Sequence, residues 1–223
     1  MSSNGKALFM AVKLLVFGFP GSGKSTIARH ITAHLKDRNW ESTHFSDHVI
    51  LKEMFLADSE GKLFQPTDHG GFDILDLNAL DTALQMLEQA INQHLLSPKQ
   101  EEIVLIEFSR NDYLRAFQQF SDTFLWDAHF LYLDVDSEIC KRRIQERTAH
   151  PSTKDDFFVS EYIFNTYYNK DDGQEIPQIL ERNYRIDKQK VARIDNNGSL
   201  LDSIAQINQF VDTICSLETL GNT

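Results

Sequence analysis

The segment Gly18–Ser25 constrains the fold of this chain more than any other part of the sequence. It contains Gly-Phe-Pro-Gly-Ser-Gly-Lys-Ser and fits the pattern G-x-x-x-x-G-K-[S/T] at every required position. The apolar run Val12–Phe17 comes directly before it, and Lys24–Lys36 follows with apolar residues at helical spacing. A buried strand, a glycine-rich turn and a helix in this order predict a central strand of a parallel sheet covered by helices.

The residue types of this loop predict a site for the phosphates of a nucleoside triphosphate. Glycines let successive backbone N–H groups point at phosphate oxygens, and the start of the following helix adds positive potential. We expect Lys24 to bridge the β- and γ-phosphates, Ser25 to ligate Mg²⁺, and Thr26 to assist at the α-phosphate. The predicted nucleotide-binding residues are Gly18, Phe19, Pro20, Gly21, Ser22, Gly23, Lys24, Ser25 and Thr26. Kinases, GTPases and motor ATPases share this loop, so the motif alone does not define a reaction.

The rest of the chain alternates between strand and helix patterns. Four further strands are predicted at Ser42–Ser46, Ile103–Phe108, Ala128–Val135 and Lys190–Ile194. Further helices are predicted at Val49–Ala57, Leu75–Leu96, Ser137–Arg147 and Leu200–Leu217. Residues 58–73 contain several glycines and a proline and are predicted to form a loop. Because strands separated by helices form right-handed parallel crossovers, we expect an α/β fold, a three-layer α/β/α sandwich with a five-stranded parallel sheet.

Composition narrows the class of partner. The 223 residues, of which 41% are hydrophobic and 25% charged, predict one folded domain. The net charge of −11 argues against a nucleic-acid partner, since such proteins neutralise phosphates with basic residues. Cys140 and Cys215 are predicted to be buried or half-buried thiols, with no disulfide framework or zinc site. No stretch is apolar for long enough to span a membrane, and we interpret Leu8–Phe19 as a strand, not a signal peptide, and expect a cytoplasmic protein.

The run GFPGSGKST with its following helix resembles the nucleotide and nucleoside kinases of the P-loop class, which include adenylate kinases. The run Ile103–Arg110 (IVLIEFSR) occupies the place of a second motif in that family. The resemblance implies that Glu107 belongs to the Mg²⁺ shell, through water, and that Arg110 grips the acceptor, as in the similar F-P-R of adenylate kinases. The sequence departs from that family at Ile106-Glu107, where adenylate kinases carry Asp-Gly. The alternative interpretation of Glu107 and Arg110 is that they are solvated charges at the end of a strand.

The segment Leu131–Arg147 is similar to the one that leads into the lid of these kinases. Arg143 and Arg147 lie four residues apart on one helix face, where two guanidinium groups can stabilise charge on a transferring phosphoryl group. A basic helix end that complements the helix dipole is the alternative, and we expect part of the cluster with Lys141 and Arg142 to be solvated surface.

The turn in Val191–Ser199 (VARIDNNGS) is similar to the last strand and turn of these kinases, where the backbone cradles the purine. Asn196 and Gly198 are the residues that this resemblance implies. An ordinary strand-to-helix loop with an N-cap fits the same residues equally well.

Asp47 follows the predicted second strand, where kinases of hydroxyl acceptors hold a base and nucleotide kinases begin their acceptor segment. An alcohol acceptor is helped by a carboxylate that takes its proton, whereas a phosphate acceptor needs no base. The sequence therefore leaves open whether Asp47 is a base or Arg110 binds an acceptor phosphate. We also considered His44 and His48 as metal ligands, but an N-cap role for Asp47 is simpler.

The resemblance implies an ATP- and Mg²⁺-dependent phosphotransferase that acts on a small molecule, a nucleoside or a nucleotide. We expect a single domain over 1–223, with an acceptor-binding segment at about 47–97 and a small helical lid at about 148–187. The expected catalytic residues are Lys24, Asp47, Arg110, Arg143 and Arg147.

Two alternatives remain. A GTPase switch is suggested by a D-x-x-G match at Asp68–Gly71 and an N-K-x-D match at Asn169–Asp172. Both patterns are short, and neither follows a buried apolar run, because Lys62–Thr67 and Phe164–Tyr168 come before them. The second alternative is a kinase of a larger target, such as a nucleic-acid end or a sugar nucleotide.

Overall fold

The strand β1 (Val12–Phe17) is the central strand of a five-stranded sheet in the computed structural model. The structure describes residues 11–67, 71–99, 101–149, 161–168 and 173–221. The sheet has the order β2-β5-β1-β6-β7, and all four pairings are parallel. The other strands of this sheet are β2 (Glu41–Ser46), β5 (Glu102–Phe108), β6 (His129–Asp134) and β7 (Val191–Asp195). The predicted five-stranded parallel sheet is confirmed.

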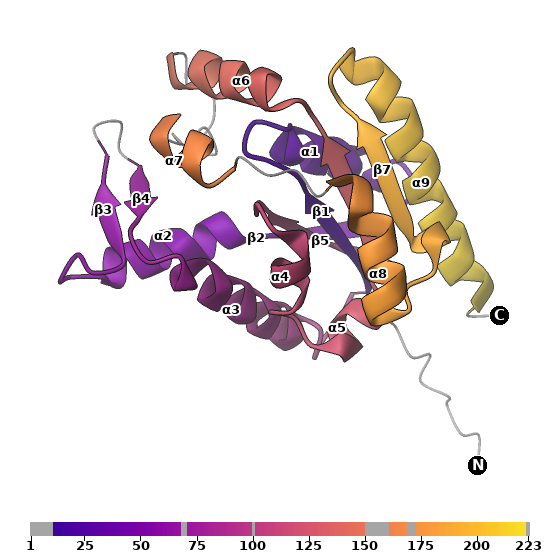
Figure 1. Cartoon of the computed structure of the whole chain (residues 1–223). Helices are drawn as coiled ribbons and strands as arrows, with labels where there is room; N and C mark the ends of the chain where they lie inside the picture. The colour runs from indigo at the N-terminus through magenta and orange to yellow at the C-terminus, as the bar shows by residue number, and fades with distance from the viewer. Residues whose placement is uncertain (1–10, 68–70, 100, 150–160, 169–172, 222–223) are drawn as a thin grey trace.

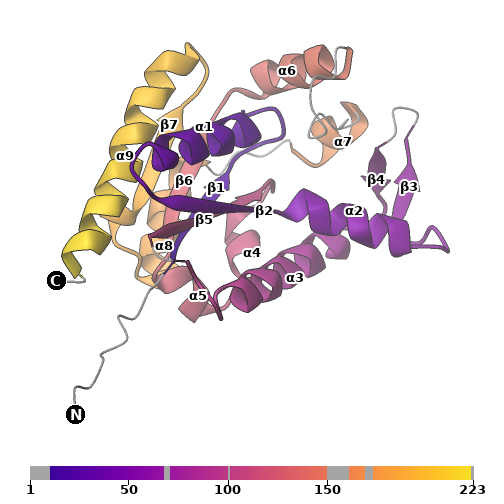
Figure 2. The same cartoon turned by 180° about the vertical axis from the view of Figure 1, so that it is seen from behind.

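Two long helices cover one face of this sheet. They are α1 (Lys24–Lys36) and α9 (Leu200–Gly221), which lie in front of the sheet in Figure 2. Ile27 and Ile31 of α1 and Val211 of α9 are fully buried against the apolar side chains of the strands. This layer carries the helix that follows the glycine-rich loop, so its packing fixes the position of the loop.

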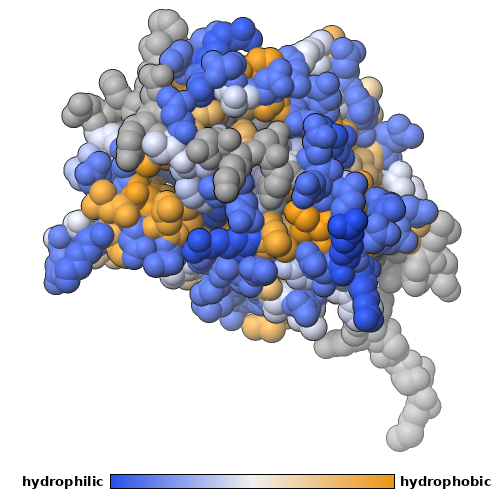
Figure 3. All heavy atoms as spheres, in the orientation of Figure 1, coloured by the Kyte–Doolittle hydropathy of each residue, from blue (hydrophilic) through white to orange (hydrophobic). Residues whose placement is uncertain are grey.

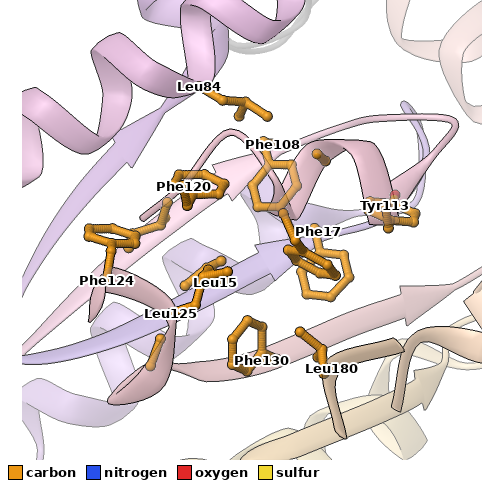
Figure 4. Close-up of a cluster of buried hydrophobic side chains, with 14 of the residues drawn as sticks. Leu15, Phe17, Leu84, Phe108, Tyr113, Phe120, Phe124, Leu125, Phe130 and Leu180 are labelled. Carbon is orange, nitrogen blue, oxygen red and sulfur yellow. The ribbon is translucent and has the colours of Figure 1, made fainter. Parts of the chain in front are cut away.

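The opposite face is covered by α3 (Asn78–His94), α4 (Tyr113–Phe117), α5 (Asp122–Trp126) and α8 (Ile176–Tyr184) (Figure 1). Aromatic rings dominate the core between these helices and the sheet (Figure 4). Phe17 and Phe108 are partners in the β1–β5 register, and their stacked rings have centroids 5.4 Å apart. Ring pairs of this kind stabilise the fold beyond the burial of their apolar area. Many of the sixteen phenylalanines of the chain lie in this core.

A small hairpin stands apart from the main sheet. The helix α2 (Asp47–Ala57) leads to β3 (Phe64–Pro66) and β4 (Phe72–Ile74), which pair antiparallel. The prediction of a loop over residues 58–73 was therefore wrong in part. The carboxylate of Asp58 accepts hydrogen bonds from the backbone N–H groups of Lys62, Leu63 and Phe64 and closes a tight turn before β3. Phe64 is buried against α2 and α3, which gives the short strands a packed side.

Two further helices, α6 (Ser137–Ala149) and α7 (Glu161–Thr166), lie at the end of the sheet where the glycine-rich loop emerges (Figure 1). Of two short 3₁₀ helices, η1 (Gly173–Glu175) precedes α8 and η2 (Lys188–Lys190) precedes β7. In the second half of the expected lid, Ile176, Leu180 and Ile186 belong to the main core. The prediction of a lid therefore applies only to the part of 148–187 that precedes α8.

The sequence analysis assigned no element to residues 111–127, where the structure has α4 and α5. Among the described residues, both cysteines are buried and neither forms a disulfide, and no helix is long and apolar enough to cross a membrane. Figure 3 shows a surface that is mostly hydrophilic, in keeping with the charged composition, with apolar side chains gathered in a few places.

Candidate active site

The glycine-rich loop between β1 and α1 requires glycine for two reasons at once. Gly21 has φ 83° and Gly23 has φ 97°, in the left-handed region that side chains disfavour. A Cβ atom on Gly21 would lie 2.5 Å from the carbonyl oxygen of Cys140, and one on Gly23 would lie 2.9 Å from Nδ2 of Asn196. The loop is thus held closely against α6 and against the turn after β7.

Lys24 is buried at the start of α1, and its ammonium group folds back over its own loop. Its Nζ donates to the carbonyl oxygens of Gly18 at 3.1 Å and Phe19 at 2.9 Å. Burial lowers the pKa of Lys24, and the carboxylates of Glu107 and Asp47 oppose this shift. The ammonium therefore lies among the groups expected to bind the phosphates.

Ser25, near the start of α1, and Glu107, near the end of β5, are in direct contact. The hydroxyl of Ser25 donates to Oε1 of Glu107 at 2.8 Å, although the two residues are 82 positions apart. Burial opposes ionisation of Glu107, but the hydrogen bond from His44 and the charge of Lys24 outweigh it and lower the pKa of the carboxyl group. A hydroxyl and an ionised carboxylate side by side are the oxygen donors that Mg²⁺ uses together with substrate phosphates and water. These residues fit the ion.

No protein-only metal site accompanies them in the described part of the chain, where no group of three or more histidine, cysteine, aspartate or glutamate side chains is placed to hold a metal. The described residues therefore give no support to His44 and His48 as metal ligands. His44 contacts Glu107, and the ring of His48 stacks on Phe72 with centroids 5.8 Å apart.

Asp47 and Arg110, which the sequence analysis treated as alternatives, form one ion pair. Nη1 of Arg110 donates to the carboxylate of Asp47, and Nη2 donates to the carbonyl oxygen of Leu80 at 2.7 Å. Both residues are buried, with exposed fractions of 6% for Asp47 and 3% for Arg110. Burial opposes the charge of Arg110, but the Asp47 carboxylate outweighs it and raises the pKa of the guanidinium. The N-cap of α2 is Ser46, whose Oγ accepts from the N–H of His48, so Asp47 does not have the simpler role considered above.

The basic cluster of α6 divides into two sets. Arg143 and Arg147 face the glycine-rich loop: Nη2 of Arg143 donates to the carbonyl oxygen of Asn196 at 2.9 Å, and the charge of Arg147 helps to lower the pKa of Lys24. Lys141 instead pairs with Glu138, and Arg142 lies 3.8 Å from Glu146. The helix thus presents two arginines to the site and keeps the other two basic residues in pairs along its own surface.

Asn196 ties the turn after β7 to the loop. Its Nδ2 donates to the carbonyl oxygen of Ser22 at 2.8 Å, and its Oδ1 accepts from Oγ of Ser203 at 2.9 Å. Gly198 is exposed, and a Cβ atom there would have no neighbour within 4 Å. Through these contacts Asn196 holds the turn against the glycine-rich loop. That the turn contacts the purine stays a prediction, and the exposed residues of the turn would have to make that contact.

One cavity of about 300 Å³ brings most of these residues together. Of the predicted site residues, those that line it are Pro20, Gly21, Gly23, Lys24, Ser25, Thr26, Asp47, Glu107, Arg110, Arg143 and Arg147. Gly18, Phe19 and Ser22 do not line it, because Phe19 packs into a small core with Tyr168 and Ser22 is fully buried. The cavity runs from the glycine-rich loop to the start of α2 and the β3–β4 hairpin.

Several lining residues were missed by the sequence analysis: Arg29, Ser46, His48, Leu51, Gly71, Phe72, Asp73, Ile74, Leu80, Ser109, Ile163 and Tyr168. Arg29 could have been found, since it lies one helical turn after Ser25. Phe72 and Tyr168 could not, because they reach the cavity from a hairpin and from the end of α7, which no local pattern announces. Tyr168 packs its ring on Phe19 of the loop, with centroids 5.7 Å apart.

A five-stranded parallel sheet with the glycine-rich loop after its central strand is the fold of the P-loop kinases. The chain belongs to the family described as an AAA domain, which matches residues 14–171. Among curated proteins, none matches this sequence.

Solved structures share the fold over nearly the whole chain. A gluconokinase from Sinorhizobium meliloti 1021 is 15% identical, covers 96% of this chain and 99% of its own, and has a TM-score of 0.52. The APS kinase of Mycobacterium tuberculosis, in complex with AMPPNP and APS, is 12% identical with a TM-score of 0.56 and covers 92% of this chain and 99% of its own. Kti12 from Chaetomium thermophilum, in complex with ADP-AlF3, is 15% identical with a TM-score of 0.56 and covers 91% and 96%. At these identities the likeness establishes the fold alone.

Proposed function

We propose that this chain is an ATP-dependent phosphotransferase that moves the γ-phosphoryl group of ATP to a hydroxyl group of a small acceptor, a nucleoside or a similar alcohol. The observation that carries the proposal is the content of a single cavity. The phosphate-binding loop with Ser25 and Glu107 lines one part of it, and the ion pair of Asp47 and Arg110 lines another. Transfer of a phosphoryl group requires that the triphosphate donor and a positioned acceptor lie together within one enclosed space.

The loop end has the groups required to hold the triphosphate. The backbone N–H groups of the loop and the Lys24 ammonium would bind the β- and γ-phosphates, and Ser25 with Glu107, through water, would hold Mg²⁺. When bound, this ion would neutralise charge on the phosphates. Arg143 and Arg147, which reach the same cavity from α6, would stabilise the charge on the transferring phosphoryl group.

The acceptor end favours a hydroxyl group over a phosphate. The two terminal nitrogens of Arg110 already donate to Asp47, to the Leu80 carbonyl oxygen and to the Ser109 carbonyl oxygen. An acceptor phosphate on Arg110 would therefore have to displace these partners and lie beside the negative charge of Asp47, which is unfavourable. A hydroxyl group has no such conflict, since the Asp47 carboxylate can accept its hydrogen bond and its proton. Arg110 then orients the carboxylate.

The comparisons support the class of reaction, not the acceptor. The gluconokinase and the APS kinase carry names of kinases, and the second was solved with both AMPPNP and APS. Both share the fold of this chain along almost its full length. The interpretation of the N-terminal apolar run as a strand is confirmed for Val12–Phe17.

The GTPase alternative receives less support. Residues 68–70 and 169–172, which hold most of the D-x-x-G match and all of the N-K-x-D match, lie outside the described residues. The segment before the first match forms β3, a three-residue strand of a separate hairpin in which Gln65 and Pro66 are exposed. A larger target is also less favoured, since Asp47 is almost completely buried at the acceptor end.

The test is nucleotide consumption with Mg²⁺ and ATP or GTP against a panel of nucleosides, nucleotides and sugars. We expect ADP release that depends on an alcohol acceptor and is abolished in Lys24→Ala. The matched control is Lys141→Ala, which removes a surface lysine paired with Glu138. Turnover of GTP that ignores every acceptor would contradict the proposal and favour the switch.

A further inference from the structure

His44 contacts Glu107 and has no role in the reaction proposed above. His44 and Ser46 point to the same face of the edge strand β2, because residues two apart in a strand share a face. Ser46 is the register partner of Glu107 on β5, so His44 lies beside that carboxylate. Its Nε2 is 3.1 Å from Oε2 of Glu107. The His44 side chain is 38% exposed, and that of Glu107 is only 8% exposed.

This contact completes the set of partners of the Glu107 carboxylate. Ser25 donates to Oε1, and His44 contacts Oε2, so each oxygen has its own partner. An ionised carboxylate only accepts hydrogen bonds, and therefore Nε2 of His44 must carry the hydrogen whether the ring is neutral or charged. With both oxygens engaged, the plane of the carboxylate is fixed relative to Ser25.

We propose that His44 is a positioning residue for Mg²⁺-dependent nucleotide binding. It holds the Glu107 carboxylate in the orientation in which Oε1 meets the Ser25 hydroxyl, so that these two oxygen donors stay arranged for the ion. The proposal rests on the proposed function only in taking Mg²⁺ and ATP as the ligands. Residues that orient a metal-shell carboxylate typically change metal affinity by about 10- to 100-fold when they are replaced.

The competing interpretation is an exposed histidine that pairs with an acid at a sheet edge and serves stability alone. A pair with that role alone would change the free energy of unfolding and leave the Mg²⁺ dependence of nucleotide binding unchanged. The two interpretations differ in one respect: only a positioning role links His44 to the concentration of Mg²⁺ at which nucleotide binds.

The experiment measures binding of AMPPNP to the full chain by titration calorimetry, at a series of Mg²⁺ concentrations and in EDTA. His44→Phe removes the donor and keeps a ring, and His44→Gln keeps an N–H group near the position of Nε2. His30→Phe is the matched control, since His30 lies on α1 and its Nε2 is 2.7 Å from Oδ1 of Asn208. Thermal unfolding of each variant measures any loss of stability separately.

We expect the half-saturating Mg²⁺ concentration to rise about tenfold in His44→Phe and to stay within about twofold of wild type in His44→Gln. Binding in EDTA should be the same in all variants, and His30→Phe should match wild type throughout. An unchanged Mg²⁺ dependence in His44→Phe overturns the proposal, and so does an equal loss of binding with and without Mg²⁺.

If His44→Phe does not fold, His44→Asn replaces it, because its amide is too short to reach Glu107. Equal Mg²⁺ dependence in the Asn and Gln variants would then overturn the proposal. This readout needs no phosphoryl transfer. Failure to find an acceptor would count against the proposed function and leave this result standing, whereas a wild-type chain that does not bind AMPPNP would contradict both.

Discussion

The guanidinium group of Arg110 and the carboxylate of Asp47 form a buried ion pair across 63 positions of the sequence. It joins the start of α2 to the second residue after β5 and, through the Leu80 carbonyl oxygen, to α3. Arg110 therefore supports the wall of the cavity, and in the proposed reaction Asp47 is the member of the pair that offers oxygen atoms to the acceptor. The two hypotheses left open by the sequence become two parts of one arrangement.

The stability of this pair gives the first prediction. Removing one partner leaves a buried charge without compensation, so Asp47→Ala or Arg110→Ala should each lower the free energy of unfolding by about 3–5 kcal/mol. The double variant should lose less than the sum of the single losses. Urea unfolding measures all three. The control pair is Arg115 and Asp81, whose exposed contact at 2.6 Å should couple by less than about 1 kcal/mol. Additive losses for Asp47 and Arg110 would show that the buried pair is not formed.

The two arginines of α6 give the second prediction. Arg143→Ala and Arg147→Ala should each reduce the turnover number by about 100-fold or more, because each removes positive charge from the site of transfer. Arg142→Ala should keep the wild-type rate, since Arg142 is exposed and lies near Glu146. Steady-state kinetics with saturating ATP and acceptor measures this. Wild-type turnover in Arg147→Ala would remove that residue from the proposed site.

The glycines give the third prediction. Gly21→Ala and Gly23→Ala should weaken ATP binding strongly, because an added Cβ atom would contact the Cys140 carbonyl oxygen or Asn196 at 2.5 Å and 2.9 Å, with φ in the left-handed region. Gly198→Ala should fold and bind ATP as wild type does, since nothing lies within 4 Å of that position. Calorimetric titration with AMPPNP measures binding. A changed base preference in Gly198→Ala would instead place the turn after β7 beside the base.

His129 gives a prediction about pH. Burial lowers its pKa from 6.5 to about 4, with a further contribution from the charge of Lys190. The unfolded chain binds the proton near pH 6.5 and the folded chain only near pH 4, so stability is complete above pH 6.5 and falls as the pH decreases between these values. A difference of this size corresponds to about 3 kcal/mol at most. Urea unfolding at several pH values should show the slope in wild type and a flatter slope in His129→Gln. Equal slopes would contradict the assignment.

The sequence was sufficient for features that local chemistry determines. The glycine-rich loop needs its residue types within eight positions, and the continuous apolar runs of β1, β5 and β6 are typical of strands buried on both faces. Ser25 and Glu107 were both named from the sequence as residues near Mg²⁺, and the structure brings the two side chains into direct contact.

Other features depend on packing that no local pattern encodes. The helices α4 and α5 have five residues each, too few for a periodic signal, and they form around buried aromatic residues such as Phe117 and Phe124. The β3–β4 hairpin includes Pro66, which is typical of a loop, and its position depends on the packing of Phe64 and Phe72. The pairing of Asp47 with Arg110 depends on the direction of α2 relative to β5, which the sequence does not show. Both residues could therefore be named from the sequence, and their pairing could not.

The chemical identity of the phosphorylated product tests the central claim most directly. ³¹P NMR of a reaction with Mg²⁺, ATP and the active acceptor distinguishes a phosphate monoester from a phosphoanhydride and from free phosphate. We predict a monoester, formed about 100-fold or more slowly by Asp47→Asn, because the amide cannot accept the proton of the hydroxyl group. Asp81→Asn, on the exposed face of α3, should form it at the wild-type rate. A phosphoanhydride product, formed equally fast by Asp47→Asn, would contradict the account.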